Sequence, residues 1–390
     1  MTDRRRVLIV GASVAGVRVA QALRTRGFAG PIALVDADEQ WPHDRPGVSK
    51  DALADAADDA LHLLTPDDLE RLDVSLHRGV AAIGLDTRGR TLGTTAGNFA
   101  YDDLVLATGS APRRLPALEG RDNVHYLRTL RDAERLRAGL DAGGRVVVIG
   151  GGFIGGEVAS AARRRGLPVD MLEGSDRLIA RAVPPPVSDD LARRHRAHGV
   201  DLRLGALVAD VDASPTRVRA VVLATGETVP GEHFVVGVGA GPDTGWLDGS
   251  GVATGNGIRC DGTLRVEGVD VDGVWAVGDA AEWLNPRYGV RHRVEHWTTA
   301  REQAAHVAAS IAAGTAVPFA AVPYVWSDQH DVRLQHVGDP DLTDVGVEVE
   351  RSDAGRVLYR YYREGAVVGA TGFNAQVAIA RVRRDLLAPI

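Results

Sequence analysis

Apolar residues in this chain gather in short unbroken runs, and most runs pass directly into glycines or an acidic residue. Runs of four to six apolar residues are typical of strands buried on both faces of a parallel sheet. Helical segments follow several runs, one of them through Leu23 and one over residues 130–140. The predicted strands occupy residues 7–10, 32–35, 104–107, 146–149, 168–172, 234–239 and 273–277. Strands that alternate with helices in this way predict an α/β fold.

The strongest single motif lies in the segment RVVVIGGGFIGGE, residues 145–157. Its predicted strand leads into Gly150, Gly152 and Gly155, the G-x-G-x-x-G pattern of a dinucleotide-binding turn. The first glycine permits the tight turn, the second lets a pyrophosphate approach the backbone, and the third lets the helix pack on the strand. The phosphate then lies at the helix N-terminus, where unpaired N–H groups favour negative charge. An ordinary tight turn is the alternative interpretation.

An acidic residue ends the next predicted strand at the expected distance. Glu173 follows the glycines by about 20 residues, where an acid hydrogen-bonds the ribose 2′-OH of NAD and repels the 2′-phosphate of NADP. We therefore predict an NAD(H) site. Arg177 lies nearby and could accommodate a 2′-phosphate, so a strict preference for NADH over NADPH is left open.

The N-terminal segment carries a second copy of the same pattern. A strand at residues 7–10 leads into Gly11, Ser13 and Gly16, and the next strand ends in Asp36. Ser13 replaces the middle glycine, which places a Cβ where a pyrophosphate must come close, although its hydroxyl can donate a hydrogen bond instead. The chain is therefore predicted to carry two dinucleotide sites.

Composition sets the outer limits on size and partners. The 390 residues are 45% hydrophobic and 25% charged, enough for two or three globular cores. The net charge of −7 argues against nucleic acids and membrane surfaces as partners. The first apolar run is too short for a secretory leader, and no apolar stretch reaches the roughly 18 residues of a membrane span. We expect a cytoplasmic protein.

Two residue types are nearly absent, and both absences bear on chemistry. Cys260 is the only cysteine, so no intramolecular disulfide, C-x-x-C pair or cysteine-rich metal site can form, and no metal is expected. Lys50 is the only lysine in a chain that otherwise uses arginine. A compact ammonium at one position suggests a function that a planar guanidinium would not serve, with chance survival as the alternative.

The remaining segments are less regular. Residues 41–50 form a loop punctuated by proline and glycine, residues 80–101 contain short alternating strands, and Pro184–Pro186 break the chain before a charged helix at 189–198. Strands follow at 200–223, and a helix runs from about residue 297 through Ile311. The tail, with strands near 325–329, 357–362 and 366–369, predicts an α+β domain.

The ordered set GASVAG, HDRPGVSK, LVLATGSAPR, VVVIGGGFIGGEV, VVGVGAGPDT, VWAVGDAA, VEHW and VWSDQ resembles the FAD-dependent NADH:ferredoxin reductases of oxygenase systems. This group includes putidaredoxin reductase and rhodocoxin reductase. The resemblance implies two Rossmann-like dinucleotide-binding domains of the glutathione reductase type and a C-terminal α+β domain. The implied boundaries are 1–112 with 245–318 for FAD, 113–244 for NAD(H) and 319–390 for the C-terminal domain.

The resemblance also assigns roles to residues. Lys50 would lie near the flavin N5 and Glu157 would pair with it beside the nicotinamide, so these two are the implied catalytic residues. An ammonium there stabilises negative charge as the ring accepts hydride. The implied cofactor-binding residues are Gly11, Ser13, Gly16, Asp36, Arg45, Lys50, Val80, Ala107, Thr108, Gly109, Arg113, Gly150, Gly152, Phe153, Ile154, Gly155, Glu157, Glu173, Gly239, Asp279, Glu295, His296, Trp297 and Trp326. Packing is the alternative role for both tryptophans.

The loop around Lys50 departs from the family pattern. His43, Gly47 and Val48 replace a tyrosine, a proline and a leucine. We expect this loop to be more flexible than in the family and His43 to titrate near neutral pH.

The missing thiols favour one mechanism within the fold. Cys260 is expected to lie in a loop before the predicted strand at residues 273–277 and, with no neighbour that would activate it, to have a packing role. Reduced flavin must therefore pass electrons directly to an external acceptor. The resemblance implies NADH as donor and a [2Fe–2S] ferredoxin as acceptor, serving an oxygenase such as a cytochrome P450 or a Rieske dioxygenase. Two arginine clusters, residues 163–165 and Arg381, Arg383 and Arg384, are candidate docking faces, or simply solvated helix faces.

Two other functions are compatible with the same residues. One is an NADH oxidase or small-molecule reductase that uses its acceptor directly. The other is an NADH-responsive flavoprotein resembling apoptosis-inducing factor. The oligomeric state, monomer or homodimer, is left open.

Overall fold

The computed structural model describes residues 5–53, 58–339, 341–342, 344–352 and 355–388. The chain divides into two compact units that each draw on separated segments. Unit 1 comprises Met1–Arg45, Asp59–Ala111 and Gly241–Pro323, and unit 2 comprises Pro46–Asp58, Pro112–Ala240 and Tyr324–Ile390.

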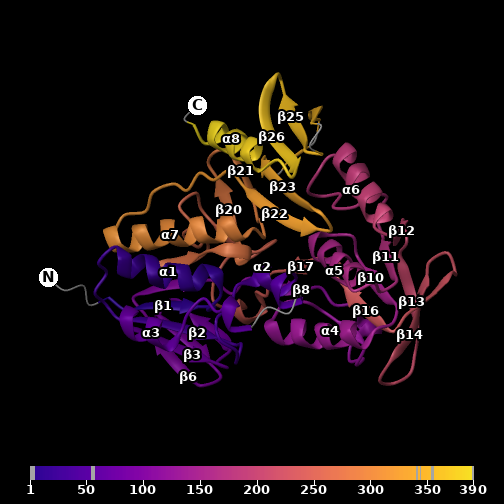
Figure 1. The fold of residues 1–390 in the computed structure, drawn as a ribbon. Helices are drawn as coiled ribbons and strands as arrows, with labels where there is room; N and C mark the ends of the chain where they lie inside the picture. The colour runs from indigo at the N-terminus through magenta and orange to yellow at the C-terminus, as the bar shows by residue number, and fades with distance from the viewer. Residues whose placement is uncertain (1–4, 54–57, 340, 343, 353–354, 389–390) are drawn as a thin grey trace. The chain divides into compact units, whose positions relative to one another are not determined.

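A five-stranded parallel sheet forms the centre of unit 1. Its strand β1 (Val7–Val10), which leads into the first glycine loop, is buried at all four residues. This burial explains why the sequence shows an unbroken apolar run there. Helices α1 (Val14–Thr25) and α7 (Trp297–Ala313) lie side by side (Figure 1), and α3 (Pro66–Leu72) packs beside them. In spatial order the strands are β19 (Val274–Ala276), β7 (Asp103–Leu106), β1 (Val7–Val10), β2 (Ile32–Asp36) and β3 (Val74–Arg78).

Two small sheets complete unit 1. One is antiparallel and consists of β4 (Ala82–Asp86), β5 (Thr91–Thr94) and β6 (Gly97–Ala100), as the alternating pattern predicts. The other consists of β18 (Ile258–Cys260), β20 (Ala281–Asn285) and β21 (Val290–His292). The single-turn helix α2 (Arg45–Val48) begins at the last residue of the first segment. Two-residue strands β8 (Ala111–Pro112) and β17 (Ala240–Gly241) mark places where the chain changes unit.

Unit 2 contains a second five-stranded parallel sheet with the same internal order. The strand that leads into the glycine loop, β10, lies between β11, which ends in Glu173, and β16. Helix α5 (Phe153–Arg164) packs on all three strands. Helix α4 (Leu130–Ala142) and helix α6 (Pro185–Ala197) contact the two edge strands. In spatial order the strands are β12 (Val200–Leu204), β11 (Val169–Glu173), β10 (Val146–Ile149), β16 (His233–Val236) and β9 (Val124–His125). A three-stranded antiparallel sheet of β13 (Val208–Ala213), β14 (Val218–Leu223) and β15 (Thr228–Pro230) belongs to the same unit.

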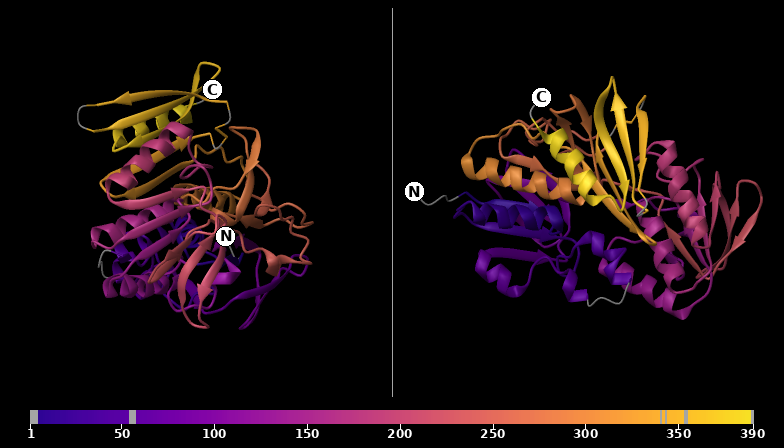
Figure 2. Two further views of the ribbon diagram at one scale, coloured as in Figure 1. Left: turned by 90° about the vertical axis from the view of Figure 1, so that its right-hand side faces the viewer. Right: turned by 45° about the horizontal axis from the view of Figure 1, so that its top comes forward.

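The C-terminal part of unit 2 is a five-stranded antiparallel sheet with one helix. Helix α8 (Gln376–Leu387) lies along this sheet (Figure 2) and contacts its two central strands. The strand order is β22 (Tyr324–Gln329), β23 (Val332–Gly338), β26 (Ala366–Phe373), β25 (Val357–Arg363) and β24 (Gly346–Arg351). The predicted α/β class with a C-terminal α+β region is confirmed.

Three local predictions are wrong. Residues 41–50 are not all loop, since α2 forms there, and Pro184–Pro186 begin a helix because proline is tolerated in a first turn. Cys260 lies in β18 and not in a loop, and burial raises the pKa of its thiol. The three-domain boundaries stay a prediction.

Candidate functional site

The glycine loop after β10 contains glycines of two kinds. Gly150 has a φ of +107°, and a Cβ there would lie 2.4 Å from the carbonyl oxygen of Gly237. A Cβ on Gly155 would lie 2.0 Å from the carbonyl oxygen of Gly150. Gly152 has an ordinary φ of −77°, and the nearest atom to its Cβ position is 3.8 Å away. The fold requires the outer glycines, whereas the middle position is open space of the kind that a pyrophosphate needs.

In each unit, the acidic residue that ends the strand after the glycine loop accepts a hydrogen bond from the backbone of that loop. Glu173 accepts hydrogen bonds from the backbone N–H groups of Gly151 at 2.6 Å and Ser175 at 2.7 Å. Asp36 accepts from the N–H groups of Ala12 at 2.5 Å and Asp38 at 2.8 Å. The two acids therefore hold their loops in shape through these hydrogen bonds.

The loop after β1 repeats this geometry with one difference. A Cβ on Gly11, whose φ is +102°, would lie 2.3 Å from the Ala107 carbonyl oxygen, and one on Gly16 would lie 1.9 Å from the Gly11 carbonyl oxygen. Ser13 caps α1, and its Oγ accepts a hydrogen bond from Arg45 Nε at 3.2 Å. The hydroxyl proton of Ser13 is thus still able to point to a ligand, as the sequence predicts.

The carboxyl ends of β7 and β19 bring further predicted residues to the same edge of the sheet in unit 1. Ser110 Oγ donates to Asp279 Oδ2 at 3.1 Å, and Arg293 Nη1 donates to the Asp279 carbonyl oxygen at 3.0 Å. Gly109 has a φ of +75°, and the buried Thr108 hydroxyl has no hydrogen-bond partner among the described residues. An orphaned buried hydroxyl at this edge of the sheet fits a polar cofactor such as FAD.

The other residues predicted for unit 1 have structural partners of their own. Val80 donates its N–H to the carbonyl oxygen of Asp36 at 2.8 Å. Glu295 accepts from Arg293 Nη1 at 2.7 Å, and Trp297 Nε1 donates to Asp44 Oδ1 at 2.6 Å. His296 caps α7, and burial lowers the pKa of its imidazole to about 4, so the ring is neutral at physiological pH.

Lys50 and Glu157 form a buried ion pair in unit 2. Lys50 Nζ lies 2.8 Å from Glu157 Oε1, with side chains 18% and 4% exposed. Ser327 Oγ also donates to Oε1, at 2.6 Å, and Ser49 Oγ donates to Oε2. The Lys50 ammonium bonds in addition to the Pro46 carbonyl oxygen at 3.4 Å, which leaves its third N–H without a protein partner among the described residues.

Sequence reasoning paired Lys50 with Glu157 but missed the two serines that complete the pair. Ser327 directly follows Trp326 in the motif VWSDQ, and Ser49 directly precedes Lys50. Their positions next to predicted residues were the only available signal, since buried serines are common in packed regions.

The remaining predicted residues of unit 2 lie beside Gly239, at the start of α5 and in β22. The N–H of Arg113 donates to the carbonyl oxygen of Gly239 at 2.9 Å, and Phe153 and Ile154 begin α5. Trp326 is half-buried and stacks on Tyr324, with ring centroids 6.1 Å apart. This tryptophan therefore keeps part of its surface available for a ligand or a partner, and so does the half-buried Trp297 of unit 1.

Arg181 is a further candidate that the sequence did not indicate. Its Nη2 lies 3.2 Å from the Cβ position of Gly239, at the end of β16. The exposed guanidinium is therefore close to the predicted NAD(H) loop region. Arg177, the residue suspected of accommodating a 2′-phosphate, donates to the Ala180 carbonyl oxygen at 3.1 Å.

Burial and the neighbouring Arg45 lower the pKa of the His43 imidazole below its ordinary value. Its Nδ1 lies 2.9 Å from the Trp41 carbonyl oxygen, and its Nε2 lies 2.9 Å from Arg45 Nη1. In the first arginine cluster, Arg163 and Arg165 bond to backbone carbonyls of their own unit, which leaves Arg164 as its exposed member.

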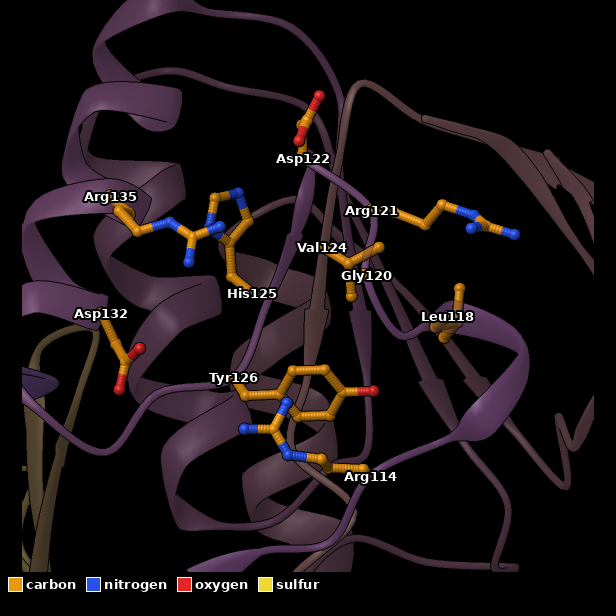
Figure 3. Close-up of a pocket in the computed structure, with 10 residues that line it drawn as sticks. All are labelled: Arg114, Leu118, Gly120, Arg121, Asp122, Val124, His125, Tyr126, Asp132 and Arg135. Carbon is orange, nitrogen blue, oxygen red and sulfur yellow. The ribbon is translucent and has the colours of Figure 1, made fainter. Parts of the chain in front are cut away.

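A cavity of about 310 Å³ lies beside β9 in unit 2. Figure 3 shows Arg135 beside His125 and Arg114 over Tyr126, and the Arg114 guanidinium carbon is 4.9 Å from the centre of the tyrosine ring. None of the residues that line this cavity is a predicted cofactor-binding residue. This cavity is therefore separate from the glycine loop after β10 in unit 2.

Neither a metal centre nor a membrane span is found in the part of the chain that the structure describes. No three His, Cys, Asp or Glu side chains gather there as metal ligands. No described helix combines the length and the apolar character that crossing a membrane requires.

Two family models match nearly the whole chain. Residues 5–304 match the pyridine nucleotide-disulphide oxidoreductase model, and residues 324–388 match the reductase C-terminal model. The first family implies FAD and a nicotinamide cofactor, in agreement with the open glycine loop and the orphaned hydroxyl described above.

Curated relatives and a solved structure agree with these models. The ferredoxin–NAD(+) reductase component of the p-cumate 2,3-dioxygenase system of Pseudomonas putida is 37% identical, over 98% of this chain and 93% of the relative. Putidaredoxin reductase of Pseudomonas putida is 37% identical over 87% of this chain and 81% of its own. The covalent putidaredoxin reductase–putidaredoxin complex contains a similar chain with a TM-score of 0.92, 33% identity and coverage of 98% and 93%.

Proposed function

Because the chain belongs to the pyridine nucleotide-disulphide oxidoreductase family, and within it to the ferredoxin reductases of oxygenase systems, we propose that it passes electrons from NADH through FAD to a [2Fe–2S] ferredoxin. One observation supports an external acceptor. A protein with two dinucleotide loops has a single cysteine, and that cysteine is buried in β18. Without a dithiol relay, electrons would leave the flavin directly for an external acceptor, for which we propose the ferredoxin.

Each part of the site has a role in this reaction. FAD, when bound, accepts a hydride from NADH and gives up electrons one at a time. The loop after β1, with Asp36, would hold FAD, and the loop after β10, with Glu173, would hold NADH. Lys50 would place a positive charge beside the reacting ring, and Glu157 keeps the ammonium oriented through the 2.8 Å contact. Ser49 and Ser327 each donate a hydrogen bond to the Glu157 carboxylate, so its oxygens have partners inside unit 2.

The ferredoxin would dock on exposed arginines. Ferredoxins are commonly acidic, so a net-acidic reductase needs a local basic surface. Arg164, Arg381 and Arg384 are exposed, although Arg384 also pairs with Asp385 at 2.9 Å. We propose that the partner serves an oxygenase, and we keep cytoplasmic localisation and the three-domain division as parts of the same proposal.

The proposed function is tested by NADH-driven cytochrome c reduction with purified FAD-loaded protein. A [2Fe–2S] ferredoxin added at increasing concentration is expected to stimulate the rate at least tenfold and to saturate. Glu157→Gln is expected to lower that rate without abolishing FAD binding, because only the ion pair is altered.

Ferredoxin-independent consumption of NADH would contradict the proposal and favour direct reduction of oxygen or a small molecule. Very slow NADH oxidation that leaves a long-lived reduced flavin would favour an NADH-responsive flavoprotein instead. Several ferredoxins are compared, so that one mismatched partner does not decide the outcome.

A further inference from the structure

A chain of hydrogen bonds leads away from the Lys50–Glu157 pair through unit 2. Ser327 Oγ donates to Glu157 Oε1 at 2.6 Å, and Gln329 Nε2 donates to Ser327 Oγ at 3.0 Å. The amide oxygen of Gln329 lies 2.9 Å from His195 Nε2. Because an amide oxygen only accepts, His195 Nε2 carries the proton and donates.

The chain continues one residue further, to His330. His195 Nδ1 lies 2.9 Å from His330 Nε2. Burial lowers the pKa of the His195 imidazole to about 4, so the ring is neutral and its Nδ1 accepts when Nε2 donates. His330 Nε2 is therefore the donor. Every donor in the chain points inward, from His330 toward the carboxylate of Glu157.

The inner members are buried and the outer end approaches solvent. Ser327, Gln329 and His195 are each at most 1% exposed, whereas His330 is half-buried. The exposed His198 stacks on His330, with ring centroids 4.2 Å apart and planes 12° apart. Hydrogen bonds of one polarity strengthen one another in a low-dielectric interior, so the chain of hydrogen bonds as a whole strengthens the contact of Ser327 with the Glu157 carboxylate.

The backbone around the chain is shaped to admit it. A Cβ on Gly156 would lie 2.3 Å from Gln329 Oε1, so only glycine lets the amide reach its place. Gly156 lies outside the G-x-G-x-x-G pattern, which does not explain it. The N–H of His330 donates to Ser160 Oγ at 2.9 Å, and Ser160 Oγ donates to the Gly156 carbonyl oxygen at 2.7 Å.

The chain of hydrogen bonds can orient side chains but is not suited to transferring protons. A carboxamide does not readily take up and release protons, so Gln329 interrupts any relay between the histidines and Glu157. The inward direction of all donors would also oppose a proton moving outward from the carboxylate. What the chain supplies is a fixed direction for the Ser327 hydroxyl.

We propose that His195 and Gln329 are positioning residues of the reductase: they aim the Ser327 hydroxyl at Glu157, which in turn holds the Lys50 ammonium in one orientation for the hydride-accepting flavin. This inference rests on the proposed role of Lys50 beside the flavin. It assigns a task to a histidine and a glutamine that the sequence did not indicate as cofactor-binding residues, and it predicts that the effect of replacing them reaches the flavin through Lys50.

The single lysine makes the test direct. Protein grown with lysine labelled with ¹³C at Cε gives one side-chain cross-peak pair, from Lys50, in the FAD-loaded enzyme. Gln329→Met removes the amide at similar length, His195→Leu breaks the chain one residue further out, and His195→Gln keeps a donor near the position of Nε2. The matched control is Thr371→Val in β26, which removes a buried hydroxyl that bonds to Tyr361 and His336.

In the wild type the two Hε protons of Lys50 are expected to give separate signals, because the ammonium is held in one orientation. In Gln329→Met and His195→Leu these signals are expected to merge. The rate of flavin reduction by NADH is expected to fall about tenfold. The equilibrium constant for that reduction is expected to fall threefold to tenfold, where tenfold corresponds to about 30 mV in a two-electron potential. His195→Gln and Thr371→Val are expected to stay within threefold of wild type on each measure.

The proposal is overturned if Gln329→Met and His195→Leu fold and keep the wild-type Lys50 signals and flavin potential. It is equally overturned if Thr371→Val causes the same changes, because the effect would then reflect general loosening of the sheet. These readouts require no electron acceptor. Failure of the proposed ferredoxin reaction would appear separately, in the wild-type protein, as turnover that ignores added ferredoxin.

Discussion

Gly152 and Gly155 belong to one loop, but different physical constraints act on them. The Cβ position of Gly155 collides with a backbone oxygen 2.0 Å away, whereas that of Gly152 has no atom closer than 3.8 Å. Packing within the protein accounts for Gly155. The approach of a ligand accounts for Gly152.

We therefore expect Gly152→Ala to fold with a thermal unfolding midpoint close to that of the wild type and to bind NADH at least tenfold more weakly. Gly155→Ala is expected to lower the midpoint strongly, since its neighbour is rigid backbone. Calorimetry and NADH titration of the two variants side by side test this. Equal loss of stability in both would show that the middle position is not kept open for a ligand.

Single residues were predictable where their type was unusual. Lys50 stands out as the only lysine, and the glycines stand out by their spacing. Gln329 was not indicated, because it meets Glu157 through Ser327 from a strand about 170 positions away and its type carries no signal. The lowered pKa of His43 was not predictable, because the sequence does not show that this histidine is buried against Arg45.

At the scale of elements, each acid-bearing strand holds its glycine loop through its terminal carboxylate, in addition to the ribose contact that we propose for that carboxylate. Glu173 accepts from Gly151 and Ser175, and Asp36 accepts from Ala12 and Asp38. The carboxylate thus fixes the start of the helix to the end of the strand. Its charge and its acceptor oxygens perform two separable tasks.

Glu173→Ala removes both tasks and is expected to lower kcat/KM for NADH more than tenfold, while that for NADPH falls less than threefold. Glu173→Gln keeps one carbonyl oxygen for the Gly151 N–H but loses the charge. It is expected to lose discrimination against NADPH with a smaller loss toward NADH. Steady-state kinetics with both nucleotides measure the two ratios, and an unchanged preference in both variants would argue against this assignment.

Most strands of the two parallel sheets were predicted to within about a residue because each buried run is apolar on both faces, but the run at 234–239 extends three residues beyond β16. The run at residues 7–10 and that at 146–149 match β1 and β10 completely. Helix α2 was missed because Pro46 and Gly47 look like helix breakers, although proline fits the first helical turn. Sheet order was not predictable, since β19 pairs with β7 across about 170 residues.

At the scale of the whole molecule, buried histidines link stability to pH. Burial lowers the pKa of His125, His195 and His296 to about 4, and that of His330 to about 3. The unfolded chain takes up protons near pH 6.5, whereas the native protein does not. The stability that the neutral histidines contribute is therefore fully present above about pH 6.5 and is lost as the pH falls toward 4. Aspartates with lowered pKa values contribute to the loss only below about pH 4.

We expect the thermal unfolding midpoint to fall steadily between pH 6.5 and 4. Each fully buried histidine contributes at most on the order of 3 kcal/mol over this interval. His125→Phe, which removes one such group at similar size, is expected to make the decline shallower, whereas the exposed His198→Gln is the control. Parallel curves for His125→Phe and wild type would contradict this account.

The resemblance implied that residues 1–112 and 245–318 form one domain, but the sequence did not indicate that the segment around Lys50 belongs to a different compact unit from the segments on either side of it. Residues 46–58, which carry Lys50, cluster with unit 2, although the segments before and after them belong to unit 1. Long-range contacts decide this, such as the Lys50–Glu157 pair and the bond from Arg165 Nη2 to the Leu53 carbonyl oxygen. Local pattern cannot reveal them.

This sharing of segments has a consequence for synthesis on the ribosome. The edge strand β19 pairs with β7 only after residues 274–276 have emerged, and the Lys50 segment contacts β22 residues near position 327 through Glu157. At about 5–20 residues per second, β1 waits on the order of 10 to 50 seconds for the last strand of its sheet. During translation, the apolar runs that make the fold recognisable are therefore exposed longest, and the nascent chain depends on chaperone shielding more than a protein built from contiguous domains.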